Sequence, residues 1–362
     1  MRLYQRYLTK EFLQIFTLSL LALLSIYLLL EFFGSLDDFI ENHVGPFIII
    51  VYLFNQLPFY ASQFIPLSLL LATMLTLGSM GQNNELVAFR ACGFTLRQLS
   101  LPLIIVGICA ALLTFAMTEY LVPATFARAK HIKTVIIKQK KEKKLFNLQN
   151  VWYTGQDYIY HFKELIPEED TIRGATIYQL DEQSCLIRRV DAEKIVYQHG
   201  IWTGFAVNSR TFSYHEGRSD LQEFNRQQQV SLAISEQPKD FLIPQKAVEE
   251  MNFRELQHYI DKVKNIGIDV TEYEVQRYHK LFFPLACPIM VLLGIPFSLG
   301  GRRSGGTARG IGLSLVIGFS FWFILSFSLA LGKGGVMSPA PAALLPHLLY
   351  GVAGLGLIQR KK

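Results

Sequence analysis

Charged residues are scarce in this chain. Asp, Glu, Lys and Arg make up only 18% of its 362 residues, whereas 51% are hydrophobic and the mean hydropathy is positive. This composition argues against an ordinary soluble enzyme. The charge is nevertheless too high for membrane helices alone. We therefore expect a membrane part joined to one ordinary domain.

Cysteine is also rare. The chain has four, Cys92, Cys109, Cys185 and Cys287. The topology derived below places Cys109 and Cys287 in the membrane and Cys92 in the cytoplasm, so Cys185 is alone outside. No internal disulfide framework is possible on that topology.

The sequence lacks the usual motifs of catalysis. Its eight histidines are scattered, and none belongs to an HExxH or a Cys/His metal pattern. The nearest approach to a phosphate loop, GRRSGGT at Gly301 to Thr307, has no lysine of GxxxxGK[ST] and is more simply a basic loop. We therefore expect no catalytic residue, no metal, no cofactor, no ATPase domain and no nucleic-acid partner.

Long hydrophobic runs are what the chain does have. About 20 apolar residues, rising ~1.5 Å each, span a hydrocarbon core of ~30 Å. The first such run follows basic residues, but it is too long for a typical signal peptide and no cleavage site follows, so we expect a retained helix. Six segments qualify: Phe12 to Phe33, one within Phe47 to Met80, Leu99 to Thr118, Leu281 to Leu299, Gly310 to Leu331, and Ala342 to Ile358.

Charges in the short loops orient these helices. The loop after the first helix carries Asp37, Asp38 and Glu41 and no Lys or Arg. Basic residues instead occupy alternate connections and the two ends: Arg2, Arg6, Lys10, Arg90, Arg97, Arg302, Arg303, Arg309, Arg360, Lys361 and Lys362. The positive-inside rule makes their side cytoplasmic. Both termini are then cytoplasmic, and the long polar stretch from Tyr120 to about Lys280 is outside.

One basic cluster lies on the outer side. Long loops translocate despite their charge, so this cluster does not overturn the topology. It is either a solvated helix face or a set of ion-pair donors for an anionic ligand, and its position against the local charge bias favours the ligand. Its members are Arg128, Lys130, Lys133, Lys138, Lys140, Lys141, Lys143 and Lys144.

The outer stretch from Phe146 to Ile243 has the pattern of β structure. Short runs rich in β-branched and aromatic residues are separated by glycines, which predicts a sandwich or jelly roll. The expected strands lie at Val151 to Tyr153, Tyr158 to Phe162, Thr176 to Leu180, Lys194 to Tyr197, and Ile201 to Val207.

A short helical unit is expected after the strands. Asn252 and Glu255 have the spacing of a capping box, and Gly267 suits a helix end. A second amphipathic run covers Glu272 to Lys280. The expected organisation is helices 1–3 at 1–125, a basic connector at 126–145, the β domain at 146–245, amphipathic helices at 246–280, and helices 4–6 at 281–362.

The cytoplasmic loop from Asn83 to Gly93 predicts a two-turn helix at 84–92. Asparagine is a good N-cap, Glu85 suits the positive helix start, and Gly93 suits the stop. This helix is either a plain connector or a coupling helix that docks on a cytoplasmic ATPase. In the second case its apolar side chains fill a groove and Glu85 pairs with a basic group.

Small residues recur every four positions on the fifth hydrophobic segment, at Gly310, Ser314 and Gly318. This spacing lets two helices approach closely. It indicates helix packing, either within the chain or against another subunit.

Taken together, these features resemble the lipopolysaccharide export permease family of the LptF/LptG (YjgP/YjgQ) type. The resemblance covers nearly the whole chain. NELVAFRACGFT at Asn84 to Thr95 is similar to the family's coupling helix, and HKLFFPLACPIMVLLGIPFSL at His279 to Leu299 to its fourth helix. EFFGSLDDF at Glu31 to Phe39 and the brief C-terminus look more like the LptG type.

The resemblance implies a fold and partners. The fold is membrane α-helical, with six transmembrane helices and a periplasmic all-β jelly-roll-like domain inserted between helices 3 and 4. The implied partners are an LptF-like second permease, an LptB-like cytoplasmic ATPase dimer, LptC-like and LptA-like periplasmic bridge proteins, and lipopolysaccharide. The implied location is the bacterial inner membrane.

The resemblance also assigns site residues. Glu85, with Leu86, Phe89 and Arg90 of the same helix, matches the segment that meets the ATPase. Lys130 and Lys133, within EYLVPATFARAKHIK, match basic positions that contact lipid phosphates. Glu31 departs from relatives that have a lysine near this point. A carboxylate cannot bind phosphate directly, so Glu31 is expected to pair instead with a lysine of the partner permease.

The leading interpretation is therefore a non-enzymatic permease subunit of an ABC-type complex. It would extract lipopolysaccharide from the inner membrane and pass it to a periplasmic bridge, with the energy supplied by a separate ATPase. The alternative is a non-transporting membrane scaffold whose β domain recruits other proteins. A secondary transporter is the third possibility, but beyond Glu31 and Glu119 the sequence places no cluster of charges in the membrane.

Overall fold

The computed structural model describes residues 3–138, 149–154, 158–166, 169–181, 185–198, 201–215, 218–232, 234, 246–265, 269–298 and 306–360. The chain divides into two compact units. A helical unit comprises Met1–Glu142, Ala247–Leu256 and Thr271–Lys362, and a β unit comprises Lys143–Lys246 and Gln257–Val270. The basic residues Lys140 to Lys144 and the loop Gly301 to Gly305 lie outside the described residues.

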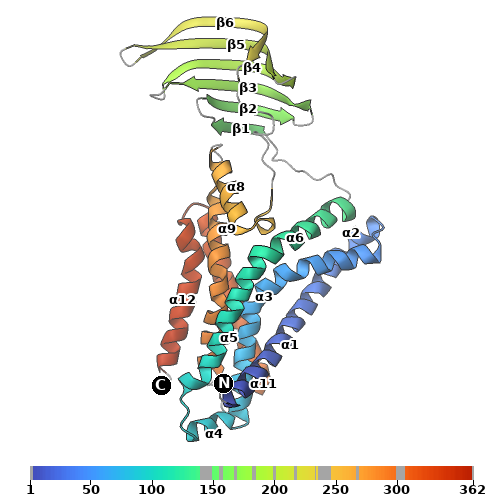
Figure 1. Ribbon diagram of the computed structural model, residues 1–362, viewed down its shortest axis with the longest axis vertical. Helices are drawn as coiled ribbons and strands as arrows, with labels where there is room; N and C mark the ends of the chain where they lie inside the picture. Colours follow the sequence, from blue (N-terminus) through green and yellow to red (C-terminus); the bar gives the residue numbers. More distant parts are fainter. Residues whose placement is uncertain are drawn as a thin grey trace. The chain divides into compact units, whose positions relative to one another are not determined.

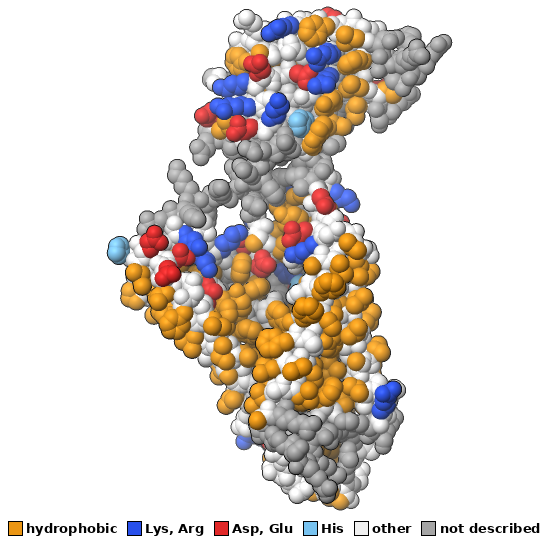
Figure 2. All heavy atoms as spheres, turned by 180° about the vertical axis from the view of Figure 1, so that it is seen from behind, with side chains coloured by type: hydrophobic (Ala, Val, Ile, Leu, Met, Phe, Trp, Pro, Cys, Tyr) orange, Lys and Arg blue, Asp and Glu red, His pale blue; other side chains and the backbone are white. Residues whose placement is uncertain are grey.

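The helical unit confirms the six predicted apolar helices. Among the described residues, six helices are long and apolar enough to cross a membrane. Figure 2 shows a broad band of hydrophobic side chains over this unit, with charged side chains gathered beside the band. The six spans are Tyr4–Gly34, Pro46–Gln82, Gln98–Ile137, Thr271–Ser298, Gly310–Lys333 and Pro339–Arg360.

Three of these spans are single helices. They are α1 (Leu3–Gly34), α11 (Gly306–Lys333) and α12 (Pro339–Arg360). The second span, α3 (Pro46–Gln82), is also continuous, although Pro58 and Pro66 lie inside it. A short helix, α2 (Leu36–Glu41), joins α1 to α3.

The third span is far longer than the sequence suggests. It runs through α5 (Leu96–Ala116), η1 (Met117–Leu121), α6 (Val122–His131) and η2 (Ile132–Ile137), where η1 and η2 are π-helical turns. At ~1.5 Å per residue, its 40 residues extend about 60 Å, twice the thickness of a hydrocarbon core. The part carrying Arg128, Lys130 and Lys133 is therefore a helical extension of the third helix.

The fourth span begins earlier than predicted. It comprises α9 (Thr271–Phe282), a 3₁₀ turn η5 (Phe283–Leu285) at Pro284, and α10 (Ala286–Ser298). The amphipathic run at Glu272 to Lys280, which we expected to be a separate helix leading into the fourth span, is the first part of that span. The pattern is amphipathic because α9 packs on α11 and α12 through one side, including the buried Val275.

The two-turn helix between the second and third spans is α4 (Glu85–Ala91). Its end has the Schellman arrangement. Gly93 adopts φ +86°, the Phe94 N–H donates to the Phe89 carbonyl at 3.1 Å, and the two rings meet edge to face. In Figure 1, α4 lies at the same end of the helical unit as the start of α1 and the end of α12.

The β unit contains one antiparallel sheet of six described strands in chain order (Figure 1). The five predicted strand segments all fall within longer strands. The sixth strand was missed because it lies at the sheet edge, and its side chains up to Gln229 are exposed on both faces wherever they are described. The strands are β1 (Gln149–Thr154), β2 (Tyr158–Ile166), β3 (Thr171–Leu180), β4 (Leu186–Gln198), β5 (Ile201–His215) and β6 (Arg218–Leu232).

A crease crosses the middle of this sheet. The pairing of residues passes over one position in each of the six described strands, at Asn150, Lys163, Gly174, Glu193, Ala206 and Gln228. The alternation of buried residues changes there, from Tyr160 and Phe162 to Leu165 in β2, and from Val190 and Ala192 to Ile195 in β4. Since all these side chains join one hydrophobic cluster, the sheet bends around them and keeps one buried face.

Two short helices complete the described chain. They are η4 (Val248–Glu250) and α8 (Phe253–Asn265). The predicted capping box of α8 is formed, because the Glu255 N–H donates to Asn252 Oδ1 at 2.8 Å and the Asn252 N–H donates to Glu255 Oε2 at 3.2 Å.

Candidate functional site

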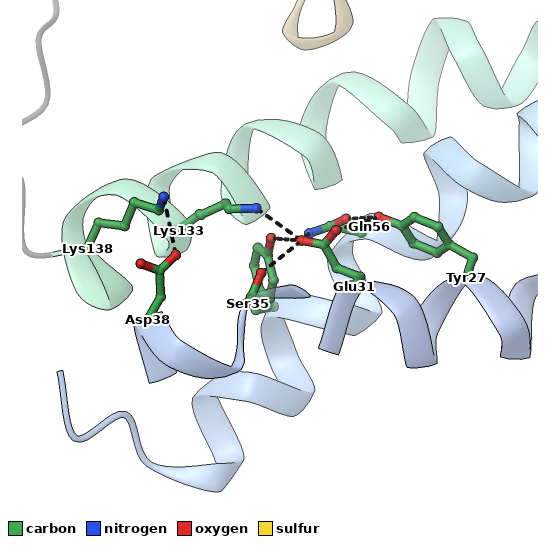
Figure 3. Close-up of polar contacts among 8 residues, drawn as sticks. Tyr27, Glu31, Ser35, Asp38, Gln56, Lys133 and Lys138 are labelled. Carbon is green, nitrogen blue, oxygen red and sulfur yellow. Dashed lines mark hydrogen bonds and ion pairs between the residues drawn. The ribbon is translucent and has the colours of Figure 1, made fainter. Parts of the chain in front are cut away.

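A polar cluster lies where α1, α3 and the extension of the third helix meet (Figure 3). Glu31 comes from the last turns of α1, Tyr52 and Gln56 from α3, and Lys133 from η2. Hydrophobic packing brings these elements together, because Phe39, Tyr52, Ala129 and Ile137 share one buried cluster. The polar groups are therefore held by a well-packed frame.

Glu31 is the centre of this cluster. Its Oε1 atom accepts hydrogen bonds from Tyr52 Oη at 2.6 Å, from Ser35 Oγ at 3.3 Å and from Gln56 Nε2 at 3.4 Å (Figure 3). Tyr27, one turn earlier on α1, donates to the Gln56 side-chain oxygen. This carboxylate is thus ionised at low cost, because several donors replace the water that it loses.

Lys133 lies directly against Glu31. Its Nζ atom is 3.0 Å from Glu31 Oε1 and 5.6 Å from the centre of the Tyr52 ring. The Lys133 side chain is 39% exposed, whereas that of Glu31 is 19% exposed. Water or a ligand can therefore reach the ammonium more readily than the carboxylate. The lysine that pairs with Glu31 in the structure belongs to this same chain and not, as expected, to a partner permease.

Two further ion pairs continue along the same extension. Lys130 pairs with Glu250 of η4, and Lys138 Nζ lies 3.2 Å from Asp38 Oδ2 of α2. The described basic residues at these three positions thus each face a carboxylate contributed by another element. This pairing balances the charge of the three cations on the extension.

The predicted coupling residues lie at the opposite end of the helical unit, on α4. Tyr7 Oη of α1 donates to Glu85 Oε2 at 3.4 Å, and Asn83 Nδ2 donates to Glu85 Oε1 at 3.5 Å. Phe89 is partly buried and contacts the rings of Tyr4 and Phe94. The side chain of Arg90 is outside the described structure.

The expectation that Leu86 fills a groove in a partner needs revision. Leu86 is 6% exposed and belongs to the hydrophobic core formed with α1, α3 and α5. Val87, the next residue, is 41% exposed and points away from that core. The sequence could not separate these two residues, because a helix of two turns gives too few repeats to identify its buried side.

The small residues of α11 face α3 within the chain. Ser314 is fully buried, and its Oγ donates to the Gly310 carbonyl at 2.8 Å and to Met74 Sδ at 3.0 Å. A Cβ atom on Gly318 would lie 2.4 Å from Leu67 Cδ1, so only glycine fits the present contact. The sequence left open whether these small residues pack within the chain or against another subunit. Their described contacts are within the chain.

A half-open cavity of about 460 Å³ was not foreseen from the sequence. It lies between α3, α9, α11 and the start of the third helix's extension. Most of its lining is aromatic or aliphatic, and Lys280 lies at its wall with its ammonium bonded to the Met251 carbonyl. No single motif marks this cavity, because seven separate elements contribute to it. Phe59, Tyr60, Phe64, Val122, Val248, Phe283, Trp322 and Leu325 are among the lining residues.

Six apolar helices, a β unit inserted after the third, and ion pairs on a helical extension define a multi-pass membrane protein with a large extramembrane domain. Comparison with known proteins narrows this class. Residues 6–360 match the model of the family described as lipopolysaccharide export system permease LptF/LptG, and the chain belongs to that family.

Two curated relatives match over almost their entire length. The lipopolysaccharide export system permease protein LptG of Escherichia coli strain K12 is 26% identical over 98% of both chains. The protein of the same name from Haemophilus influenzae strain Rd is 23% identical over 99% of this chain and 98% of the relative. Both relatives carry the LptG name, in agreement with the type that the sequence resembles.

Proposed function

We propose that this chain is the permease subunit of an ABC-type lipopolysaccharide export complex in the bacterial inner membrane. It takes lipopolysaccharide from the membrane and passes it to a periplasmic bridge of LptC-like and LptA-like proteins. An LptF-like permease completes the membrane part, and an LptB-like ATPase dimer supplies the energy. The chain itself performs no covalent chemistry.

The arrangement of the helical unit supports the proposed topology. The basic chain ends and α4 share one end of the unit, while α2 and its acidic residues lie at the other end (Figure 1). The positive-inside rule makes the first end cytoplasmic. The polar cluster around Glu31 then belongs to the periplasmic side, next to the leaflet from which the lipid is taken.

The observation that carries the proposal is that the Lys133 side chain is held in place by Glu31 and is still 39% exposed. A lipid phosphate that approaches Lys133 gains a charge-assisted hydrogen bond in a site that is partly shielded from water. Lys130 lies one helical turn earlier and is 44% exposed. The two ammonium groups therefore offer a pair of contacts to a phosphorylated headgroup.

The cavity lined by α3, α9 and α11 supports a lipid cargo. Its walls are mainly aromatic and aliphatic, and its volume of about 460 Å³ falls in the ~300–1,000 Å³ range of small-ligand pockets. An acyl chain is stabilised there by burial of its apolar surface. The buried face of the sheet is the proposed next surface for the acyl chains, in a jelly-roll-like periplasmic domain.

Transport requires that ATP hydrolysis in the separate ATPase move the helices that carry this site. We place the contact with the ATPase at α4, through Glu85 and the outward-facing Val87. Because Leu86 and Phe89 fasten α4 to the core of the helical unit, a displacement of α4 is transmitted to α1 and α3. Those two helices also carry Glu31 and Tyr52.

Bound lipopolysaccharide should be measured in the purified complex with the ATPase and the second permease. Changing both Lys130 and Lys133 to alanine is expected to lower bound lipid and lipid-stimulated ATP turnover by about tenfold or more, a loss of ~1.4 kcal/mol or more. Changing both to glutamate is expected to lower them further, because it adds repulsion to phosphate.

Lys138→Ala is the matched control, because Lys138 is 38% exposed and also pairs with a carboxylate. It lies farther along the extension and should have a smaller effect. Equal lipid occupancy in the wild type and all three variants would show that these lysines form only a solvated surface. Lipid export in the absence of ATP hydrolysis would contradict the role of the ATPase.

A further inference from the structure

The outer face of the β sheet carries a shallow hollow of about 470 Å³ beside the crease. This volume lies within the ~300–1,000 Å³ range of small-ligand sites. The hollow is formed entirely by strands β1 to β5, and of its lining residues only Ala175 and Ala192 also belong to the cluster of buried hydrophobic residues. The proposed path of the acyl chains along the buried face of the sheet does not include this hollow.

Aromatic rings form one wall of this hollow. The Trp152 ring lies 4.5 Å from that of His161 and is nearly parallel to that of Tyr178, with an interplanar angle of 11° and a centroid distance of 6.0 Å. Trp152 nevertheless remains 47% exposed. Cross-strand ring contacts stabilise the sheet, but they do not require so much of a large apolar ring to face solvent.

Polar side chains with fixed positions form the other wall. Asp191 accepts hydrogen bonds from Thr176 Oγ1 and Arg189 Nε at 2.9 and 3.0 Å, and Arg210 also pairs with it. The Arg189 guanidinium lies 5.6 Å from the Tyr178 ring. Donors and acceptors are thus held beside the aromatic rings before any ligand arrives, which lowers the entropy cost of binding.

The backbone of the hollow is itself unusual. Gly174 and Ala206 both line it, and both have positive φ, +61° and +53°. The value for Gly174 is unstrained, but alanine rarely adopts this conformation. The side chain of Lys163 lies over Gly174, where a Cβ atom would be only 2.7 Å from Lys163 Cδ. Backbone strain of this kind clusters at active sites and ligand sites.

The charge of the hollow is balanced. Lys163 and Arg189 on its wall are matched by Asp191 and Glu193. A strongly anionic or cationic ligand therefore gains little from it. Of the described strands that form the hollow, β2 to β5 are paired on both sides and only β1 has an unpaired edge, so an added peptide strand would lie beside β1 and not over the hollow.

We propose that this hollow binds an uncharged saccharide. A pyranose ring has an apolar face of C–H groups that fits a flat aromatic side chain such as Trp152, and a rim of hydroxyls that both donate and accept hydrogen bonds. Asp191 supplies acceptors, Arg189 supplies donors, and Asn208 of the same hollow supplies both. The proposed permease thereby has a second binding site on its β unit, which binds sugar and not lipid.

The test uses the full chain in lipid nanodiscs free of lipopolysaccharide. Hexamers of glucose, galactose and mannose are the neutral probes, galacturonic acid hexamer is the anionic probe, and a neutral Gly-Ser hexapeptide represents a protein partner. Binding is followed by saturation-transfer NMR and by tryptophan fluorescence. At least one neutral hexamer is expected to bind, with a Kd at least tenfold lower than those of the acidic sugar and the peptide.

Trp152→Ala is expected to weaken binding of that hexamer at least tenfold, and Trp152→Phe less. Leu221→Ala is the control, because Leu221 is an exposed apolar residue of β6 that does not line the hollow. Asn208→Ala provides a second variant that leaves β1 intact and is also expected to weaken binding. Near-UV circular dichroism verifies that each variant is folded.

Four results would overturn the proposal. They are failure of all three neutral hexamers to bind, equal or tighter binding of the acidic hexamer, binding of the peptide alone, and unchanged affinity in folded Trp152→Ala and Asn208→Ala. Because these measurements need neither ATPase nor lipid transport, they are independent of the proposed export function.

Discussion

Glu31 and Lys133 are 102 positions apart in the sequence, yet their charged atoms lie 3.0 Å from each other. The pair joins the end of the first membrane helix to the extension of the third. Its cation is the more exposed partner, so a ligand can reach the ammonium more readily than the carboxylate. The predictions that follow begin from this relationship.

Replacing Glu31 by glutamine should increase the binding of lipopolysaccharide. The carboxylate competes with lipid phosphate for Lys133, and the amide keeps the shape of the side chain but loses the charge. We expect bound lipid to rise by about three- to tenfold, corresponding to ~0.7–1.4 kcal/mol. The amount of lipid that copurifies with the complex, determined by mass spectrometry, measures this effect.

Lys133→Met in the Glu31→Gln background is the control. If Lys133 binds the phosphate, the gain disappears in the double variant. A gain that persists without Lys133 would show that Glu31 repels the lipid by itself, and a decrease in Glu31→Gln would show that the carboxylate holds Lys133 in its binding position.

Replacing Glu85 by alanine should weaken the association with the ATPase or its coupling to transport. The reason is the loss of a charge near the start of α4, which is fixed to the helical core by Leu86. We expect about a tenfold lower affinity, or ~1.4 kcal/mol, in a pull-down with the purified ATPase. The thermal stability of the membrane part should remain unchanged.

Tyr7→Phe separates the two contacts of Glu85. It removes the hydrogen bond from Tyr7 Oη and leaves the carboxylate in place. Normal ATPase binding in Tyr7→Phe, with weak binding in Glu85→Ala, identifies a direct contact. Equal defects in both variants would mean that Glu85 acts only within the chain.

Adding one methyl group to Gly318 should destabilise the helical unit. In Gly318→Ala the new Cβ meets Leu67 at a distance that neither atom can keep, so α11 and α3 must move apart or Leu67 must change rotamer. Overpacking of this kind typically costs ~1–3 kcal/mol. The midpoint of thermal unfolding in detergent should fall.

Gly312→Ala on the same helix is the matched variant. A Cβ atom there has no atom within 4 Å, so its melting midpoint should stay within error of the wild type. Equal midpoints for the two variants would show that the contact between Gly318 and Leu67 is not tight in the folded protein.

The sheet should depend on the charge of Asp191. Burial raises the pKa of this carboxyl group. Hydrogen bonds from Arg189, Thr176 and Arg210 and the charge of Arg189 outweigh burial, and the pKa is lowered below its ordinary value. A lowered pKa means that ionised Asp191 stabilises the folded state above the pKa of the unfolded chain. This stabilisation is lost as the pH falls through the lower, folded-state pKa.

Asp191→Asn should therefore lower the free energy of unfolding at pH 7 by about 1.5–3 kcal/mol, as expected for lost hydrogen bonds to a charged group. The difference from the wild type should begin to shrink below about pH 4, the ordinary pKa of a free aspartate, and should disappear as the pH falls through the lower folded-state pKa, where the wild-type carboxyl group is also neutral. Denaturant unfolding of the β unit at several pH values measures it. A difference that is constant with pH would exclude a role for the ionised carboxylate.

The local sequence was enough for elements whose cause is local. Apolar runs of about 20 residues predict membrane helices because the hydrocarbon core imposes a length. The capping box of Asn252 and Glu255 and the glycine stop at Gly93 are likewise short-range, and the structure contains both. Even the five strands recognised from composition were located correctly, although each proved longer.

Pairing across long distances required the tertiary structure. The sequence marked Lys133 as a basic residue out of place, but not that Glu31 would meet it, because α1 and the third helix are brought together by apolar contacts with α3. The buried side of α4, the strand β6 with its polar side chains, and the hollow beside Trp152 were hidden for the same reason. The composition and the hydrophobic periodicity of a segment indicate its own secondary structure, whereas these features depend on which segments pack against one another.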